Sequence, residues 1–263
     1  MLGWLPTYTQ GDTTMARNWM MATALVLALG AGSVQAAVPG NIAAALSDKA
    51  RPAEEMARDA SRKPGEVLAL GEVKTGGKVV DLVMGGGYFT RILSAAVGPK
   101  GQVIGYQPTE FIQFQASYGE NQKKVAAAYA NVTPLTATFG AMDLPDGMDL
   151  VLTVQNYHDL HLKPFPADTA KKVNSEIFKS LKPGGIYLIV DHTALAGSGL
   201  EAADKIHRID PAIVRQEVEA AGFKLESESA MLAEPSDPKT GNVFAPGIRG
   251  KTDQFIMKFR KPK

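Results

Sequence analysis

The segment 78–97 constrains the fold of this chain more than any other. Residues 78–84 (KVVDLVM) are mostly apolar and rich in Val, which is typical of a strand buried on both faces of a sheet. Three glycines, 85–87, follow directly, and the apolar-periodic segment Tyr88–Val97 comes next. Because glycine has no Cβ, a ligand can lie against bare backbone near the first N–H groups of the predicted helix. The segment therefore predicts a strand, turn and helix of the kind that hold nucleotide-like ligands in open α/β sheets.

The N-terminal 36 residues have the pattern of a secretory signal peptide. Arg17 precedes the short apolar run Trp19–Leu29, and the small residues around Val34 and Ala36 are typical of a cleavage site. We expect cleavage after Ala36 and a periplasmic or otherwise exported domain at residues 37–263, with no stable membrane insertion afterwards. Although the apolar run is short for a transmembrane helix, an uncleaved membrane anchor is the alternative interpretation.

Charge and cysteine content exclude several classes of function. The chain has 28 Lys and Arg against 27 Asp and Glu, and this formal net charge of +1 gives no support for electrostatic binding of nucleic acid. It has no Cys, which excludes a thiolate nucleophile and disulfides and leaves His, Asp and Glu as candidate metal ligands. A domain of this size must therefore rely on a packed core for its stability.

Beyond the N-terminal helical extension at 37–64, predicted strands alternate with predicted helices. Strands are expected to begin near residue 78 and to lie at 102–106, 132–138, 149–155, 186–190, 223–227 and 254–259. Helices are expected at 41–60, 67–70, 88–97, 110–129, 167–181 and 211–222, with Asn41 and Asp210 as N-caps of the first and last. This alternation predicts a Rossmann-like, doubly wound α/β fold with a mostly parallel seven-stranded sheet.

The last two predicted strands have no helix between them and should form an antiparallel hairpin. The Pro- and Gly-rich stretch that connects them, 234–250, is long for a loop in a compact domain. Loops of such length are often functional, so this one is a candidate part of the site.

Four sequence landmarks follow one another along the predicted domain. They are VDLVMGGG at 80–87, LPDGMDLV at 144–151, LKPGG at 181–185 and AAGF at 220–223. In this order and spacing, over residues 65–260, the chain resembles the class I S-adenosylmethionine-dependent methyltransferases. Four shorter motifs, RKP at 62–64, GYFT at 87–90, NYHD at 156–159 and HRID at 207–210, resemble a group of exported bacterial "predicted methyltransferases". The resemblance implies the predicted fold, methyl transfer to a small molecule, and S-adenosyl-L-methionine as cofactor.

The resemblance also implies which residues bind that cofactor. Those at the glycine turn are Asp81, Gly85, Gly86, Gly87 and Tyr88. At the end of the second strand, where the family usually has an acidic residue for the ribose hydroxyls, this chain has Gln107, and Glu110 could reach the ribose instead. Asp143 is the carboxylate nearest the expected adenine region. Val83 replaces the first glycine of the family's motif, which should tighten the loop.

Polar residues gather where the fourth and fifth predicted strands end. The candidate catalytic residues are Asn156, Tyr157, His158, Asp159 and His192, with Asp191, His207 and Asp210 expected nearby. The carboxyl ends of parallel strands meet at one edge of the sheet, so these residues should share a cleft. A His of near-neutral pKa suits removal of a proton from the methyl acceptor, an adjacent Asp can orient it, and Asn156 and Tyr157 occupy positions that place an acceptor in the family. Alternatively, Asn156, His158 and Asp159 only stabilise loop backbone, which is the interpretation we prefer for His161.

Two other functions use the same cleft. A non-catalytic ligand-binding protein on a methyltransferase scaffold is favoured by Val83 and Gln107. A metal-assisted hydrolase could draw ligands from His158, Asp159, Asp191, His192 and His207. Because no H-x-x-x-H pair on one helix is present, the sequence assigns no metal ligand. The charged run containing Arg58, Arg62 and Lys63 is either a solvated surface or a lid over the cleft.

Overall fold

The computed structural model describes residues 37–263. The expected signal peptide and its cleavage site lie outside the described residues. Within 37–263, no helix is both long enough and apolar enough to cross a membrane.

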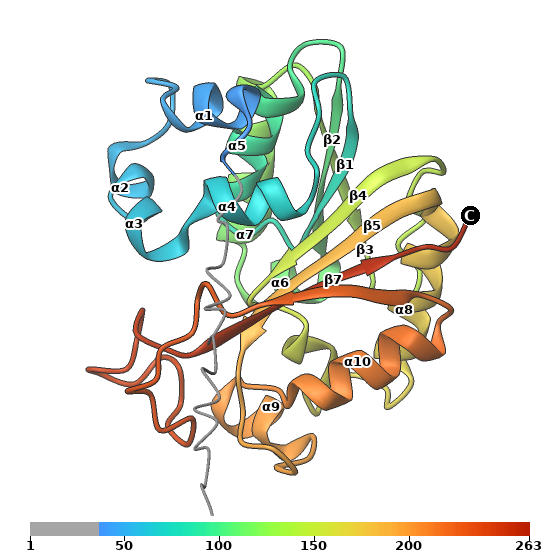
Figure 1. The fold of residues 1–263 in the computed structure, drawn as a ribbon. Coiled ribbons are helices and arrows are strands. Elements are labelled where there is room, and N and C mark those ends of the chain that lie inside the picture. Colours follow the sequence, from blue (N-terminus) through green and yellow to red (C-terminus); the bar gives the residue numbers. More distant parts are fainter. Residues whose placement is uncertain (1–36) are drawn as a thin grey trace, which may run out of the picture. The chain divides into compact units, whose positions relative to one another are not determined.

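A seven-stranded sheet forms the centre of the domain, with strand order β3-β2-β1-β4-β5-β7-β6 (Figure 1). The strands are β1 (Lys78–Leu82), β2 (Gln102–Pro108), β3 (Val132–Ala137), β4 (Met148–Val154), β5 (Leu181–His192), β6 (Lys224–Ser229) and β7 (Gln254–Arg260). Strands β1 to β5 pair in parallel, whereas β7 lies antiparallel between β5 and β6. The predicted Rossmann-like α/β fold with a terminal antiparallel hairpin is therefore confirmed.

Helices cover both faces of the sheet (Figure 1). One face carries α1 (Gly40–Leu46), α4 (Pro64–Leu70), α5 (Tyr88–Val97) and α7 (Ser117–Ala128), and the other carries α8 (Thr169–Ser180) and α10 (Pro211–Ala220). The remaining helices are α2 (Ala53–Met56), α3 (Asp59–Arg62), α6 (Thr109–Phe114), α9 (Glu201–Ile206) and a 3-10 helix at His158–His161.

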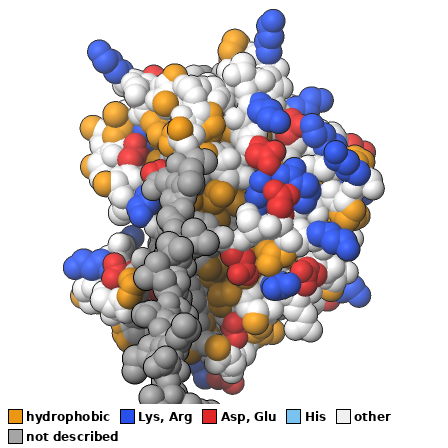
Figure 2. Space-filling view, viewed as in Figure 1, with side chains coloured by type: hydrophobic (Ala, Val, Ile, Leu, Met, Phe, Trp, Pro, Cys, Tyr) orange, Lys and Arg blue, Asp and Glu red, His pale blue; other side chains and the backbone are white. Residues whose placement is uncertain are grey.

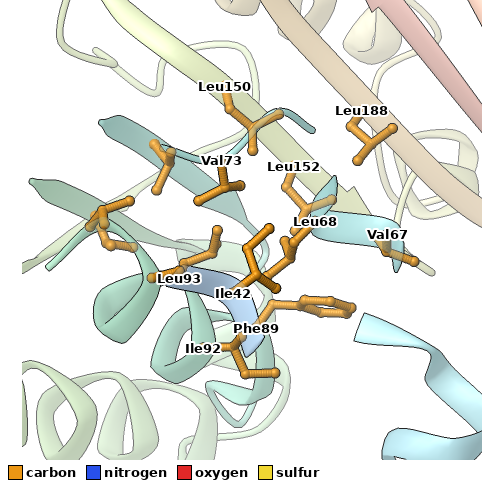
Figure 3. Close-up of a cluster of buried hydrophobic side chains, with 14 of the residues drawn as sticks. Ile42, Val67, Leu68, Val73, Phe89, Ile92, Leu93, Leu150, Leu152 and Leu188 are labelled. Carbon is orange, nitrogen blue, oxygen red and sulfur yellow. The ribbon is translucent and has the colours of Figure 1, made fainter. Parts of the chain in front are cut away.

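The alternation of side chains along the central strands produces two hydrophobic cores. On one face, Leu150, Leu152 and Leu188 contact the cluster that includes Leu68 and Leu93 (Figure 3). Their strand neighbours point to the opposite face and pack against α8 and α10, namely Val80, Val151, Tyr187 and Ile189. Full burial of each such side chain stabilises the fold by about 1.5–3 kcal/mol. These two cores hold the strand ends, and hence the residues that follow them, in fixed positions.

The N-terminal extension differs from the predicted single helix over 41–60. It forms three short helices. Pro52, which has no N–H to continue a helix, lies between α1 and α2 and precedes α2. Asn41 is not an N-cap, since its side-chain amide donates to the carbonyls of Val73 and Ala96, each at 3.1 Å. The predicted helix over 110–129 is likewise divided into α6 and α7 by the extended residue Gln115. Asp210 is confirmed as an N-cap, accepting from the N–H of Ala212 at 2.9 Å.

The long connection between β6 and β7 contains no helix or strand. It is anchored by Arg208, which is fully buried and forms a two-pronged ion pair with Asp237 at 2.6 and 3.0 Å. The same guanidinium donates to the carbonyl of Gly241 at 2.8 Å. A buried bidentate pair of this kind fixes the loop against the domain. On the face shown in Figure 2, acidic side chains are interspersed among the basic ones.

Candidate active site

A cavity of about 1160 Å³ opens at the carboxyl ends of β1, β4 and β5. Ligand pockets usually have volumes of about 300–1000 Å³, so this one has room for a large ligand and a second molecule beside it. Of the residues assigned from the sequence, the lining contains Asp81, Gly85, Gly86, Tyr88, Glu110, Asn156, His158, Asp159 and His192. Gly87, Gln107, Asp143 and Tyr157 are not part of the lining.

The three glycines have different roles. A Cβ built on Gly85 or Gly86 meets no atom within 4 Å, so both present bare backbone to the cavity. Gly87 is the N-cap of α5 with a φ of 90°, and a Cβ there would lie 2.6 Å from Val125. Gly87 is therefore required by helix packing, whereas Gly85 and Gly86 leave space that a ligand can occupy.

Val83 adopts a φ of 61°, in the left-handed region that glycine tolerates and β-branched residues avoid. Its side chain is nevertheless buried in the second core. A non-glycine residue in this region costs about 1–3 kcal/mol and persists only when its surroundings enforce it. The turn thus holds Val83 in a backbone conformation that glycine adopts more readily.

Asp81 lies at the cavity wall and is almost fully buried. Burial raises the pKa of its carboxyl to about 6, against the opposing effects of a 2.6 Å hydrogen bond from Thr90 and the positive charge of Arg62. The carboxyl can therefore change its charge near neutral pH, as ionisable groups at functional sites often do.

The expected ribose contacts are arranged differently from the sequence-based assignment. Gln107 lies behind the glycine turn, where its Oε1 accepts from the N–H of Gly85 at 3.0 Å, so we assign it to positioning the turn. Glu110 does reach the cavity, with one oxygen accepting from the N–H of Phe139 at 3.1 Å. Its other oxygen is buried without a hydrogen-bond partner among residues 37–263. Asp143 lies outside the cavity lining and has a left-handed φ of 52°.

The N-terminal extension supplies a basic wall of the cavity, which includes Arg58 and Arg62. From the sequence, this charged run could be either a solvated surface or a lid over the cleft. The guanidinium of Arg62 lies 4.4 Å from the centre of the Tyr88 ring and 5.2 Å from that of Phe89. Tyr88 is held in turn by a 2.6 Å hydrogen bond from its hydroxyl to Asp59, which also binds Arg51 through both carboxylate oxygens. These contacts fold the extension onto the glycine turn.

Arg62 carries a positive charge into the cavity without forming an ion pair. Burial and the nearby Arg58 lower the pKa of Arg62 to about 10, so it still carries its charge at neutral pH. Within the described chain its side chain makes ring contacts but no hydrogen bond or ion pair. A half-buried guanidinium without an ion pair is suited to the carboxylate of a bound ligand.

His158 and Asp159 occupy the opposite wall, whereas Asp191, also expected in the cleft, is buried behind His158 and does not line the cavity. Nδ1 of His158 lies 2.8 Å from Oδ1 of Asp191, and its Nε2 lies 3.2 Å from Oδ1 of Asp159. Burial opposes the charged ring, but the two carboxylates outweigh it and raise the pKa of His158 to about 10. Burial also opposes ionisation of Asp159, whose pKa is nevertheless held well below its usual range by His158.

His192 has the opposite environment. Burial lowers its pKa to about 4, and its Nδ1 lies 2.8 Å from the hydroxyl of Thr252. A general base works best with a pKa near the operating pH, which neither His158 nor His192 has. The expectation of a histidine with near-neutral pKa is therefore not met by these two rings.

Tyr157 turns away from the cavity into the core. Its hydroxyl lies 2.9 Å from a carboxylate oxygen of Glu217 and accepts from the amide of Asn174 at 2.8 Å. Asn156 does line the cavity and donates to Asp159 at 2.9 Å. His161 lies 3.1 Å from Glu217, in the structural role expected of it.

Aromatic side chains complete the cavity. They are Phe89, Phe111, Phe114, Tyr118, Phe165 and Phe244. Phe244 comes from the long loop 234–250, which was expected to be functional, whereas the phenylalanines of α6 carried no signal that distinguishes them from core residues. Both Phe114 and Phe244 are well exposed, at 86% and 58%, so apolar surface is available at the cavity mouth.

The strand order, the glycine turn after β1 and the cavity at the strand ends define a class I S-adenosylmethionine-dependent methyltransferase fold. Residues 61–209 match the ubiE/COQ5 methyltransferase family, and the chain belongs to this family. S-adenosylmethionine is accordingly its cofactor. Gly85, Gly86 and Arg62 are suited to that molecule, because they combine an open backbone cradle with an unpaired cation.

Solved structures share the fold at low sequence identity. An S-adenosylmethionine-dependent methyltransferase from Aquifex aeolicus has a TM-score of 0.55 and 21% identity over 78% of this chain and 92% of that chain. A putative sarcosine dimethylglycine methyltransferase from Galdieria sulphuraria has a TM-score of 0.55 and 18% identity over 80% and 88%. A putative methyltransferase from Bacillus halodurans has a TM-score of 0.52 and 20% identity over 77% and 100%. At these identities the likeness establishes the fold alone.

Proposed function

We propose that this protein transfers a methyl group from S-adenosylmethionine to a small molecule with an apolar ring system, bound in the aromatic part of the cavity. The observation that carries the proposal is a single cavity with two unlike walls. One wall has the bare backbone of Gly85 and Gly86, and the other has His158 and Asp159. The bound cofactor supplies an electrophilic methyl group on a sulfonium.

The chain's own residues would divide the work between the two walls. Gly85 and Gly86 would admit the cofactor to the backbone, Arg62 would bind its carboxylate, and Glu110 would accept from its hydroxyl groups. On the other wall, Asn156 holds the carboxylate of Asp159, and Asp191 holds the ring of His158. An acceptor with aromatic rings would displace water from the phenylalanines and place a polar atom at this second wall.

Cofactor binding is tested most cleanly at Gly86. This residue has no left-handed φ and no atom within 4 Å of the position that a Cβ would take, so Gly86→Val places a side chain in the cavity without backbone strain. Gly40→Val is the matched control, because Gly40 is equally unobstructed but does not line the cavity. By calorimetry we expect Gly86→Val to weaken binding of S-adenosylmethionine at least tenfold with an unchanged melting temperature. Equal affinity in Gly86→Val and the wild type would contradict the assignment.

The non-catalytic alternative makes a different prediction from the same protein. A binding protein would retain the cofactor or another ligand but would never convert it. Methyl transfer should therefore be measured as the formation of S-adenosylhomocysteine, with aromatic hydroxyl compounds supplied as acceptors. Turnover that disappears in Gly86→Val supports an enzyme, whereas binding without turnover across the acceptors supports the alternative.

We further propose that residues 1–36 are a secretory signal peptide and that the domain 37–263 acts in the periplasm or otherwise outside the cytoplasm. The support is the pattern of Arg17, the apolar run Trp19–Leu29 and the small residues ending at Ala36. The same pattern supports the proposal that this protein belongs to the exported methyltransferase group that its sequence resembles. Mass spectrometry of the exported protein should find Ala37 as its first residue, and a periplasmic protein that begins at Met1 or Met15 would contradict cleavage.

A further inference from the structure

We propose that His158, Asp159 and His207 form a binding site for a divalent transition-metal ion inside the cavity. The metal site itself does not depend on the methyltransferase proposal. The role we give the metal, holding an oxygen of the methyl acceptor, does rest on it. The sequence named His207 only as one of five candidate ligands of a metal-assisted hydrolase, and no metal ligand was assigned from it.

The three side chains are already close to a coordinating arrangement. One potential ligand atom from each residue lies within 4.8 Å of the other two. The distance from His158 Nε2 to Asp159 Oδ1 is 3.2 Å, and that from His207 Nδ1 to the same oxygen is 3.9 Å. Ligands at about 2.0–2.2 Å from one ion lie roughly 3–3.5 Å apart, so a modest approach of His207 toward Asp159 and His158 would complete the arrangement.

In His158 and Asp159, the atoms that would not bind the metal are already held by other groups. Nδ1 of His158 is fixed by Asp191 at 2.8 Å, which leaves Nε2 directed toward Asp159. The second oxygen of Asp159 accepts from Asn156 at 2.9 Å. A carboxylate behind a ligating imidazole and a donor behind a ligating carboxylate are the usual supports of metal sites.

His207 provides an independent observation. Its Nδ1 is buried and has no hydrogen-bond partner in the described chain, because 3.9 Å to Asp159 is too long for a hydrogen bond. The His207 ring makes edge contacts with two other rings. Its centre lies 5.4 Å from the centre of the His158 ring and 4.8 Å from that of the Phe244 ring. A buried nitrogen without a partner is unfavourable, and a metal ion at this point would satisfy it.

Charge and access also favour a cation. Two carboxylates, Asp159 and Asp191, face the single ring of His158, and a divalent ion in place of its Nε2 proton would balance them. His158, Asp159 and His207 all line the cavity, so an ion held by three protein groups would have a coordination position open to a ligand there. Mixed imidazole and carboxylate ligands suit Zn²⁺, Fe²⁺ and similar ions.

Such an ion would activate the methyl acceptor directly. A metal-bound hydroxyl group loses its proton to solvent more readily than a free one, so an acceptor oxygen could be held in its ionised form. That oxygen would then form the new bond to carbon as the carbon–sulfur bond of the cofactor breaks.

The test uses the full chain, purified without a histidine tag and stripped of metal with a chelator. Co²⁺ alone is titrated into the protein while its visible absorption is recorded, and Zn²⁺ alone is titrated by calorimetry. We expect one equivalent of each ion, bound at micromolar or tighter affinity. His207→Ala should weaken binding at least tenfold, whereas His161→Gln, a histidine outside the cluster, should bind as the wild type does.

Two outcomes overturn the proposal: a wild type that binds neither ion at millimolar concentration, or a folded His207→Ala variant that binds them as tightly as the wild type. Because the His207 side chain is 26% exposed, its removal should leave the domain folded, and a thermal melt checks this. Titration of S-adenosylmethionine into the same samples separates the two proposals. Cofactor binding without metal binding overturns the metal site alone, and metal binding without cofactor binding overturns the methyltransferase proposal alone.

Discussion

The carboxylate of Asp191 lies 2.8 Å from Nδ1 of His158 and joins the ends of β5 and β4. The same carboxylate accepts from the backbone N–H groups of His158, at 2.8 Å, and His192, at 2.7 Å. Asp191 is fully buried, so its side-chain oxygens depend on these three contacts for their hydrogen bonds. It sets both the position and the orientation of the His158 ring.

Asp191→Asn should therefore destabilise the domain strongly. The amide would turn one of its own donors toward groups that themselves donate, and would leave His158 without its main counter-charge. Breaking a buried pair in this way costs about 3–5 kcal/mol of the free energy of unfolding. Urea denaturation measures it, with Asp168→Asn as control, since the exposed Asp168–Lys172 pair should contribute less than about 0.5 kcal/mol. A loss below about 1 kcal/mol in Asp191→Asn would contradict this account.

Asp81 should make the cofactor-free protein less stable as the pH rises through its titration range. Its pKa is about 6 in the folded domain, against about 3.9 in an unfolded chain. Between these values the folded state binds more protons than the unfolded state, so stability falls as pH rises, by roughly 2–3 kcal/mol in total. Other groups titrate in the same range, so the measured quantity is the difference between wild type and Asp81→Asn from pH 4 to 7. A difference that does not change with pH would show that Asp81 ionises normally.

Val83→Gly should cost much less than a Val-to-Gly change at an ordinary buried position. Loss of the buried side chain costs about 1.5–3 kcal/mol and glycine adds about 0.5–1 kcal/mol, but removal of the strain at a φ of 61° returns about 1–3 kcal/mol. Val80→Gly, in the neighbouring strand, has no such compensation. By chemical denaturation, the free energy of unfolding of Val83→Gly should exceed that of Val80→Gly by at least about 1 kcal/mol. Equal losses would mean that the turn is not strained.

Arg62→Gln should weaken binding of the cofactor only through the lost contact with the cofactor's carboxylate. A charge-assisted contact of this kind contributes about 1.5–3 kcal/mol, so the affinity for S-adenosylmethionine should fall about 10- to 100-fold. Methylthioadenosine, which lacks the amino acid part, is the matched ligand and should bind both proteins equally. Arg215→Gln, an exposed arginine paired with Glu219, is the control variant. If both ligands lose affinity equally, Arg62 acts through the fold of the extension instead.

Local sequence was sufficient for much of the fold. The predicted helix Tyr88–Val97 has the observed bounds, because the glycines start it and the residues on its inner face recur at helical spacing. Strand β1 follows from its run of buried residues, and α10 from Asp210 and Pro211 at its start. The helix expected over 41–60 was wrong, because its Ala-rich composition outweighed the effect of Pro52 in the prediction.

The candidate site was predicted in part by the same kind of reasoning. Residues that follow parallel strands meet at one edge, and His158, Asp159 and His192 do line one cavity. The sequence pattern alone could not predict that Tyr157 points into the core. A short 3-10 helix begins directly after it, and adjacent side chains there point to different sides. The pattern also could not predict that Arg62 lies at the cavity. That position requires the N-terminal extension to fold back onto the glycine turn through the contact between Asp59 and Tyr88.

Periodicity, glycine placement and the order of motifs along the chain determined the fold class and the family, because those signals arise within a few residues of one another. Only the tertiary structure decided that Asp159 lies beside His207 and that Asp191 lies behind His158. These residues are far apart in the chain, and their distances depend on how two hydrophobic cores position three separate loops. The ionisation of each group follows from the same packing, since burial and neighbouring charge, rather than residue type, set the pKa values in this cavity.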